Sequence, residues 1–229
     1  MNETAPGTAH TTAVVAPSRT DRLLVLAIVI FDTFTLGFIT LGFEMVAGRI
    51  LTPLFGSGIY TWATIISLVV AGLMCGYFIG GFFADRFPSF GLVALIKIIS
   101  GLYLVLVWHL AGGELEAVLG FSDDEIVSLF ISGFIVCFPP LLVLGMFSPL
   151  AVRLVLSDAA AAGRVAGGLF ALSSFGNILG ILATTFLLIP NFGSRAITLS
   201  FALFALASGV LSVIIWFALR GRTVHVEVR

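Results

Sequence analysis

The chain has 229 residues, of which 59% are hydrophobic and 10% are charged, and its formal net charge at pH 7 is -1. Soluble domains usually carry about 25% charged residues, so this composition predicts an all-α, polytopic protein embedded in a lipid bilayer. The net charge argues against a nucleic-acid partner, and the scattered histidines give no metal-ligand spacing. Cys75 and Cys137 both fall in apolar runs, which indicates small buried side chains and not a disulfide.

The chain begins with a polar stretch and continues as a series of apolar ones. Residues 1–21 are rich in Thr, Ala and Pro without periodicity, and we interpret them as a disordered tail. A cleaved signal peptide is the alternative, but the apolar run that follows is too long for its hydrophobic region. A transmembrane helix needs about 20 residues. Six stretches reach that length, at 22–43, 60–84, 90–111, 126–152, 165–189 and 195–219. The expected organisation is therefore a tail, a six-helix transmembrane domain over 22–220, and a short cytoplasmic tail over 221–229.

Lysine and arginine predict the orientation, because they gather on the cytoplasmic side of membrane proteins. With six spans both termini share one side, which would hold most of the basic residues: Arg19, Arg22, Arg86, Arg153, Arg164, Arg220, Arg222 and Arg229. Arg49 and Arg195 fall on the other side with the acidic loop at 112–125. Lys97, about two turns into the third span, can snorkel back to the first side. We therefore expect cytoplasmic termini in a plasma or bacterial inner membrane.

Glycines recur every four residues in two of the spans. Gly72, Gly76 and Gly80 do so in the second span, and Gly176 and Gly180 in the fifth. Four residues bring an α-helix back to nearly the same face. Small residues so placed let the backbone of another helix approach closely, so these glycines predict helix packing.

Two acidic residues in the first span are candidates for function, because ionisable groups are costly at membrane depth. Asp32 lies about midway along the span and is interpreted equally well as a helix-packing residue or as a cation ligand. Glu44 follows at the outer end, where it could pair with Arg49 or bind a polar ligand or cation. On an unbroken helix the two lie about 140° apart, so pairing needs a break, which Gly48 and Pro53 could allow.

Two dipeptides also predict local features of the spans in which they lie. Asp85-Arg86 ends the second span, and we interpret it as a pair that anchors the helix at the cytoplasmic interface. It also resembles part of the loop motif of major facilitator transporters. Pro139-Pro140 leaves backbone carbonyls free in the fourth span. Buried in the bundle, this feature is a kink; facing a cavity, the carbonyls could bind a cation.

Residues 44–62, EMVAGRILTPLFGSGIYTW, resemble the opening signature of the membrane domain in fused MFS/spermidine synthase proteins. Further segments agree in the same order, with ADR at 84–86, a proline-rich stretch from PP at 139 to GMFSPL at 145–150, and GRV, GLFA and NILG between 163 and 180. The resemblance covers nearly the whole chain after residue 22. It implies a six-helix module that anchors, and feeds or drains, a cytoplasmic aminopropyltransferase-like partner.

Fused members of that family continue into a catalytic domain that binds a decarboxylated S-adenosylmethionine-type nucleotide. This sequence has no Gly-x-Gly-x-x-Gly turn and no soluble α/β pattern, so we expect neither enzymatic activity nor a cofactor for this chain alone. Three functions stay open. The chain could serve a separate spermidine synthase-like partner in polyamine metabolism, act as a half-size, MFS-like homodimeric transporter of a cationic metabolite, or be a purely structural membrane subunit.

Overall fold

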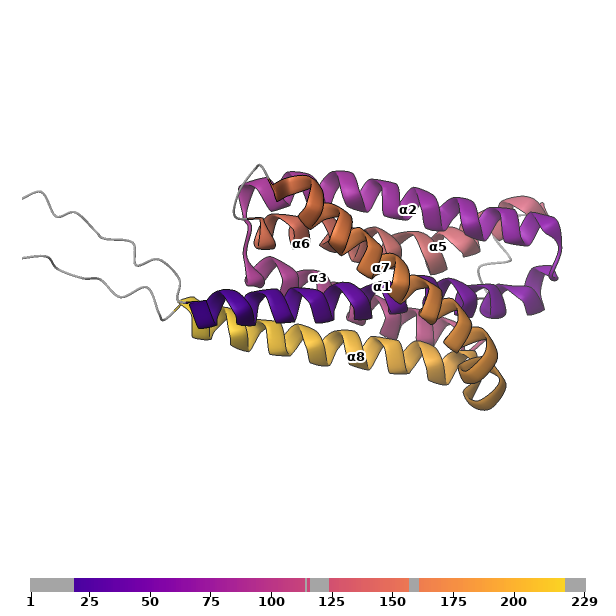
Figure 1. Ribbon diagram of the computed structural model, residues 1–229. Coiled ribbons are helices and arrows are strands. Elements are labelled where there is room, and N and C mark those ends of the chain that lie inside the picture. Colours follow the sequence, from indigo (N-terminus) through magenta and orange to yellow (C-terminus); the bar gives the residue numbers. More distant parts are fainter. Residues whose placement is uncertain (1–18, 114, 116–123, 157–160, 221–229) are drawn as a thin grey trace, which may run out of the picture.

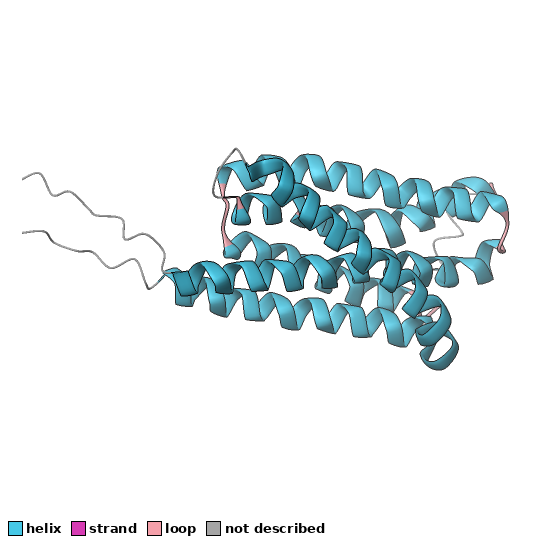
Figure 2. Ribbon diagram, in the orientation of Figure 1, coloured by secondary structure: helices cyan, strands magenta, loops and turns pink. Residues whose placement is uncertain are grey.

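The computed structural model describes residues 19–113, 115, 124–156 and 161–220, and almost all of these residues are helical (Figure 2). No strand occurs within these ranges. The expected tails lie outside the described residues, except that positions 19–21 belong to the first helix. Most of the expected acidic loop lies outside them as well. The all-α architecture expected from composition is confirmed.

The first three helices follow the predicted spans except at one end. Helix α1 spans Arg19–Phe55, α2 spans Ile59–Arg86 and α3 spans Phe90–Leu110. The predicted first span ended at residue 43, so α1 continues for about three further turns. A break at Pro53 is not formed, and the helix ends instead before Gly56, whose φ of 73° lies outside the helical region.

The predicted fourth span consists of two helices. Helix α5 spans Glu125–Gly145 and α6 spans Phe147–Val155, with Met146 between them. Pro149 falls in the first turn of α6, where the missing N–H of proline has no helical partner to lose. Helix α6 is thus a separate short helix at the C-terminal end of the predicted fourth span.

The last two predicted spans form one continuous helical segment with a reversal. Helix α7 (Ala162–Ala183) passes through a π-helical turn, η2 (Thr184–Leu188), into α8 (Ile189–Arg220). Gly193 has φ 72° and ψ 157°, and α8 then runs back along the bundle (Figure 1). By length and composition five segments could cross a membrane, the fifth being 57 residues from Ala162 to Ala218. A count of six crossings stays a prediction, in which the two arms of that segment are the last two.

Both ends of the described chain lie at the same end of the bundle (Figure 1). Helices α1, α3 and α7 run away from that end, and α2, α5 and α8 return to it. The arrangement places the ends of α2 and α6 and the start of α7 beside the termini. Which of the two ends faces the cytoplasm stays a prediction.

Three helix pairs provide most of the packing, namely α1 with α7, α2 with α5, and α3 with α8. The glycines of α2 lie directly on α5 and its end. A Cβ atom added to Gly72 would lie 2.9 Å from a backbone carbonyl oxygen, one on Gly76 would meet another carbonyl oxygen, and one on Gly80 would lie 2.5 Å from a Cα atom. The residues contacted are Phe138, Leu142 and Met146, respectively. No side chain fits at these positions without moving a backbone.

Helices α1 and α7 approach each other in the same way. A Cβ atom on Gly176 would meet the carbonyl oxygen of Phe34, and one on Gly180 would meet that of Phe38. A glycine of α1 also permits this close approach, because a Cβ atom on Gly37 would lie 2.6 Å from a backbone oxygen of α7. Close backbone approach supplies the dispersion contacts that hold helices together in lipid.

The carbonyl freed by Pro139 is bound by a side chain. Proline cannot donate to the carbonyl four residues earlier, which is that of Ile135. The Tyr103 hydroxyl of α3 donates a hydrogen bond to this oxygen at 2.9 Å. One of the two carbonyls considered for a cation site is thus already satisfied, and the bond joins α3 to α5.

Tyr103→Phe is therefore expected to lower the free energy of unfolding by about 1–3 kcal/mol, because it leaves the Ile135 carbonyl without a donor. Tyr77→Phe is the matched control, since the Tyr77 side chain is 48% exposed on α2 and makes no hydrogen bond within the described ranges. Denaturation of the purified protein in detergent micelles measures both. Equal effects of the two substitutions would show that the bond contributes nothing.

Candidate functional site

Helix α1 positions both acidic residues that the sequence singled out. Asp32 is 2% exposed and Glu44 is 9% exposed. Twelve residues separate them, which on a helix is about 18 Å along the axis and about 120° around it. They therefore face different neighbours and do not form a single site.

Asp32 is paired with Lys97 of α3. Its Oδ2 atom lies 2.6 Å from Lys97 Nζ, which is the distance of a close ion pair. The ammonium group also donates to Ser212 Oγ at 2.9 Å and to the Ser208 carbonyl oxygen at 3.5 Å, both in α8. An ammonium has three donors, and three oxygens surround this one. The cluster joins α1, α3 and α8 inside the bundle.

The expected snorkelling of Lys97 to the membrane interface is wrong. Its side chain is 1% exposed and turns inward, because a carboxylate lies within reach in surroundings of low dielectric constant. The partner of Asp32 could not be named from the sequence, since it depends on how α1 and α3 are placed side by side. A cation at Asp32 would have to compete with Lys97 for the carboxylate.

Glu44 has no counter-ion in the part of the chain that the structure describes. Arg49 lies on the same unbroken helix and does not form an ion pair with it. Glu44 also does not lie at the outer end of its helix, as expected, because α1 continues for about three turns beyond it. Glu44 therefore lies well within the length of α1 and is largely buried.

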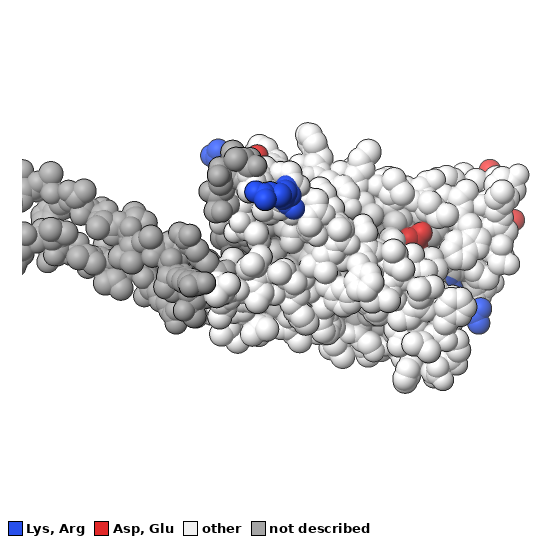
Figure 3. Space-filling model, in the orientation of Figure 1, with Lys and Arg blue, Asp and Glu red and all other residues white. Residues whose placement is uncertain are grey.

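The face of α1 that carries Glu44 is turned towards α5. Cys137 of α5 is fully buried. Two turns further along α1, Leu51 Cδ1 would lie 3.9 Å from a Cβ on Gly133, one turn before Cys137. Helices α1 and α5 run in opposite directions (Figure 1). Glu44 and Leu51 share one face of α1, and Cys137 and Gly133 share one face of α5, so the same two helix faces are in contact along this stretch. Figure 3 shows a small acidic area on this view of the surface, nearer the end of the bundle that lies away from the termini.

The π-helical turn after α7 is a feature that the sequence reasoning missed. Thr184 Oγ1 and Thr185 Oγ1 are buried in this turn without a hydrogen-bond partner, and so is Asn177 Oδ1, about two turns earlier in α7. Single π-helical turns and unsatisfied buried oxygens both occur frequently at functional sites. Thr184 lies against α1, where a Cβ on Gly42 would be 2.9 Å from its Oγ1. A π-helical turn has no distinct sequence pattern by which it could have been found.

The predicted interface pair, Asp85-Arg86, lies at the end of α2, and each of its side chains has a neighbour. Asp85 Oδ1 lies 3.9 Å from Arg153 Nε of α6, with side chains 84% and 49% exposed, respectively. The Arg86 guanidinium lies 5.9 Å from the centre of the Phe87 ring. An exposed ion pair of this kind contributes about 0–1 kcal/mol, so it marks this end of the bundle more than it stabilises it.

No protein-family model, curated protein or solved structure matches this chain. The fold and the buried charges nevertheless define its class. The chain is an all-α membrane protein with several apolar helices, and its bundle encloses an Asp–Lys ion pair and a second carboxylate.

Proposed function

We propose that this chain carries a cationic metabolite through the membrane and that Glu44 binds the positive charge. One observation carries the proposal. Glu44 is 9% exposed with no counter-ion among the described residues, whereas Lys97 already neutralises Asp32. A desolvated carboxylate costs several kcal/mol unless a cation accompanies it. A structural subunit needs no such group, and ionisable residues inside membranes mark ion and substrate pathways.

The resemblance to spermidine synthase-like membrane domains supports a polyamine as the cation. A six-helix bundle is half the size of a typical major facilitator, so a second copy of this chain would complete the path. In this proposal Glu44 receives the ammonium group from one side of the membrane. The Asp32–Lys97 pair meanwhile holds α1 against α3 and α8.

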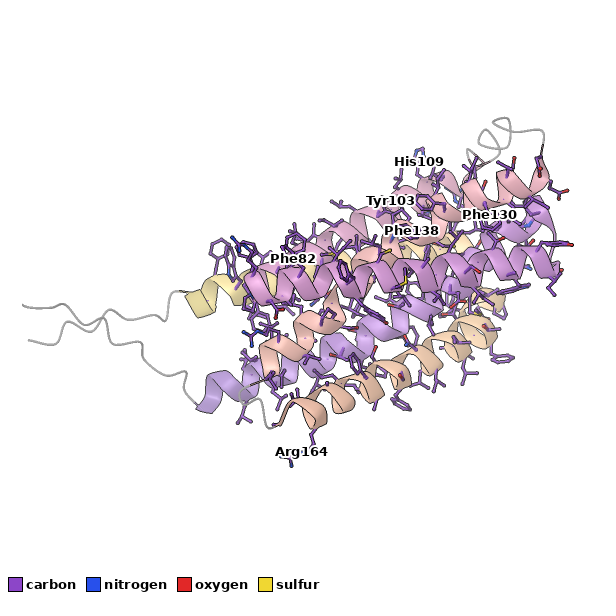
Figure 4. All side chains as sticks on the ribbon, turned by 90° about the horizontal axis from the view of Figure 1, so that it is seen from above. Phe82, Tyr103, His109, Phe130, Phe138 and Arg164 are labelled. Atoms are coloured by element: carbon purple, nitrogen blue, oxygen red, sulfur yellow. The ribbon has the colours of Figure 1, made fainter. Side chains whose placement is uncertain are left out.

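A second candidate function is the anchoring of a separate soluble aminopropyltransferase-like enzyme. The observation that favours it is a basic surface at the end of the bundle where the termini lie. Arg86, Arg153 and Arg164 are exposed there, and the Arg164 side chain projects from the edge of the bundle (Figure 4). Such a surface would attract an acidic face of a soluble partner.

Uptake of radiolabelled spermidine into proteoliposomes tests the proposal, together with spermidine binding to the purified protein. Removing one partner of a buried charge pair costs about 2–5 kcal/mol, so Glu44→Gln should weaken binding at least about 30-fold. Glu125→Gln removes the same charge from an exposed position and should leave binding unchanged. Wild-type protein that neither binds nor transports spermidine, or a Glu44→Gln variant that still does both, would contradict the proposal.

A further inference from the structure

A cavity of about 210 Å³ lies between α1 and α8, away from Glu44. Its walls are almost entirely apolar. Phe31 and Leu211 line it and are each 53% exposed at the side of the bundle, and Ala27 lies exposed at the same opening. These residues belong to segments apolar enough to cross a membrane, so the opening faces lipid hydrocarbon.

The Asp32–Lys97 pair forms the floor of this cavity. Oδ2 of Asp32 faces the ammonium, and the three contacts of Lys97 Nζ occupy its donors. Oδ1 of Asp32 receives no hydrogen bond within the described ranges, and it keeps exposed surface. One acceptor oxygen is therefore free at the end of an apolar cavity.

The charges at the floor decide which chemical group fits this oxygen. A second ammonium at Oδ1 would lie close to Lys97 Nζ, and like charges repel strongly in a medium of low dielectric constant. An anionic group would be repelled by the Asp32 carboxylate. A neutral hydroxyl can donate to Oδ1 without either cost, and a hydrogen bond to an ionised acceptor is stronger than one between neutral groups.

We propose that this cavity binds a neutral lipid with a free hydroxyl group. The lipid enters from the bilayer, donates its hydroxyl hydrogen to Asp32 Oδ1 and lays its hydrocarbon chain against Phe31 and Leu211. The site is distinct from Glu44 and does not depend on transport of a cation.

Photo-crosslinking of the full chain in nanodiscs tests this site with three diazirine-bearing probes of equal chain length. The probes are a fatty alcohol, its methyl ether and the corresponding primary amine. We expect the alcohol to label peptides around residues 27–31 and 211–215 at least about tenfold more than the ether or the amine, because only the alcohol offers a neutral donor. Equal labelling by alcohol and ether, or stronger labelling by the amine, would overturn the proposal.

A substitution at the opening avoids any change to the ion pair. Ala27→Trp places an indole across the cavity and should reduce labelling by the alcohol to the level of the ether. Ala63→Trp makes the same change at an exposed position of α2 and should leave labelling unchanged. Undiminished labelling in Ala27→Trp, or labelling that maps elsewhere in the chain, would also overturn the assignment.

Discussion

Replacing Lys97 with methionine is expected to lower the free energy of unfolding by about 3–5 kcal/mol, because it leaves the Asp32 carboxylate buried without its counter-ion. Asp32→Asn should cost a similar amount by leaving the ammonium unpaired. The double variant, Asp32→Asn with Lys97→Met, should recover most of the loss, since neutral groups of similar size often replace a buried ion pair at little cost. Unfolding of the full chain in micelles by a titration with dodecyl sulfate measures all three.

The exposed ion pair at the end of α2 is the control for this series. Asp85→Asn breaks the contact with Arg153, where both side chains are largely in contact with solvent, and should cost less than about 1 kcal/mol. If the losses of the two single variants simply add in the double variant, Asp32 and Lys97 do not stabilise each other and the described pairing is wrong.

Gly76→Leu is expected to destabilise the bundle by about 3 kcal/mol, at the upper end for overpacking. Its Cβ atom alone would meet the Leu142 carbonyl oxygen and would lie 3.0 Å from the Gly145 Cα atom, so α2 and α5 must separate. The atoms in the way belong to the backbone of α5, which cannot move aside as a flexible side chain can. The yield of folded protein in membranes and the unfolding midpoint in micelles should both fall.

Gly81→Leu provides a matched control on the same helix. A Cβ atom at Gly81 would have no neighbour within 4 Å, and leucine has the better helix propensity. Stability should therefore be unchanged or slightly higher. A similar loss in both variants would show that glycine is needed in α2 for a reason other than packing.

The sequence predicted the parts of the fold that depend on local pattern. Apolar length located the helices, and four-residue spacing marked the glycines that lie on neighbouring helices. Gly101 and Gly209 were not predicted, because single glycines form no repeat; they lie between α3 and α8, where an added Cβ atom would first meet the side chains of Leu206 and Ile98, respectively. The extension of α1 past Glu44 was missed because the predicted span was ended where its apolar run ends, at residue 43, whereas the helix continues to Phe55.

The candidate site was only partly predictable for a related reason. Membrane depth singled out Asp32 and Glu44, and that criterion needs no tertiary information. The contacts of Lys97 with Asp32 and with Ser212 depend on the alignment of three helices that are far apart in the sequence. Hydropathy describes one helix at a time. It therefore led to the prediction that Lys97 reaches the membrane interface, although its partner Asp32 lies inside the bundle.

In the proposed function Glu44 is the free carboxyl group inside the membrane, whereas Asp32 is paired with Lys97. Dicyclohexylcarbodiimide, an apolar reagent, modifies protonated carboxyl groups that lie in apolar surroundings, and peptide mapping locates the product. We expect modification at Glu44, protection of Glu44 by spermidine, and modification of Asp32 only after Lys97→Met. Modification of Asp32 in the wild-type protein would contradict its pairing with Lys97, and reaction at Glu44 that spermidine does not reduce would contradict cation binding there.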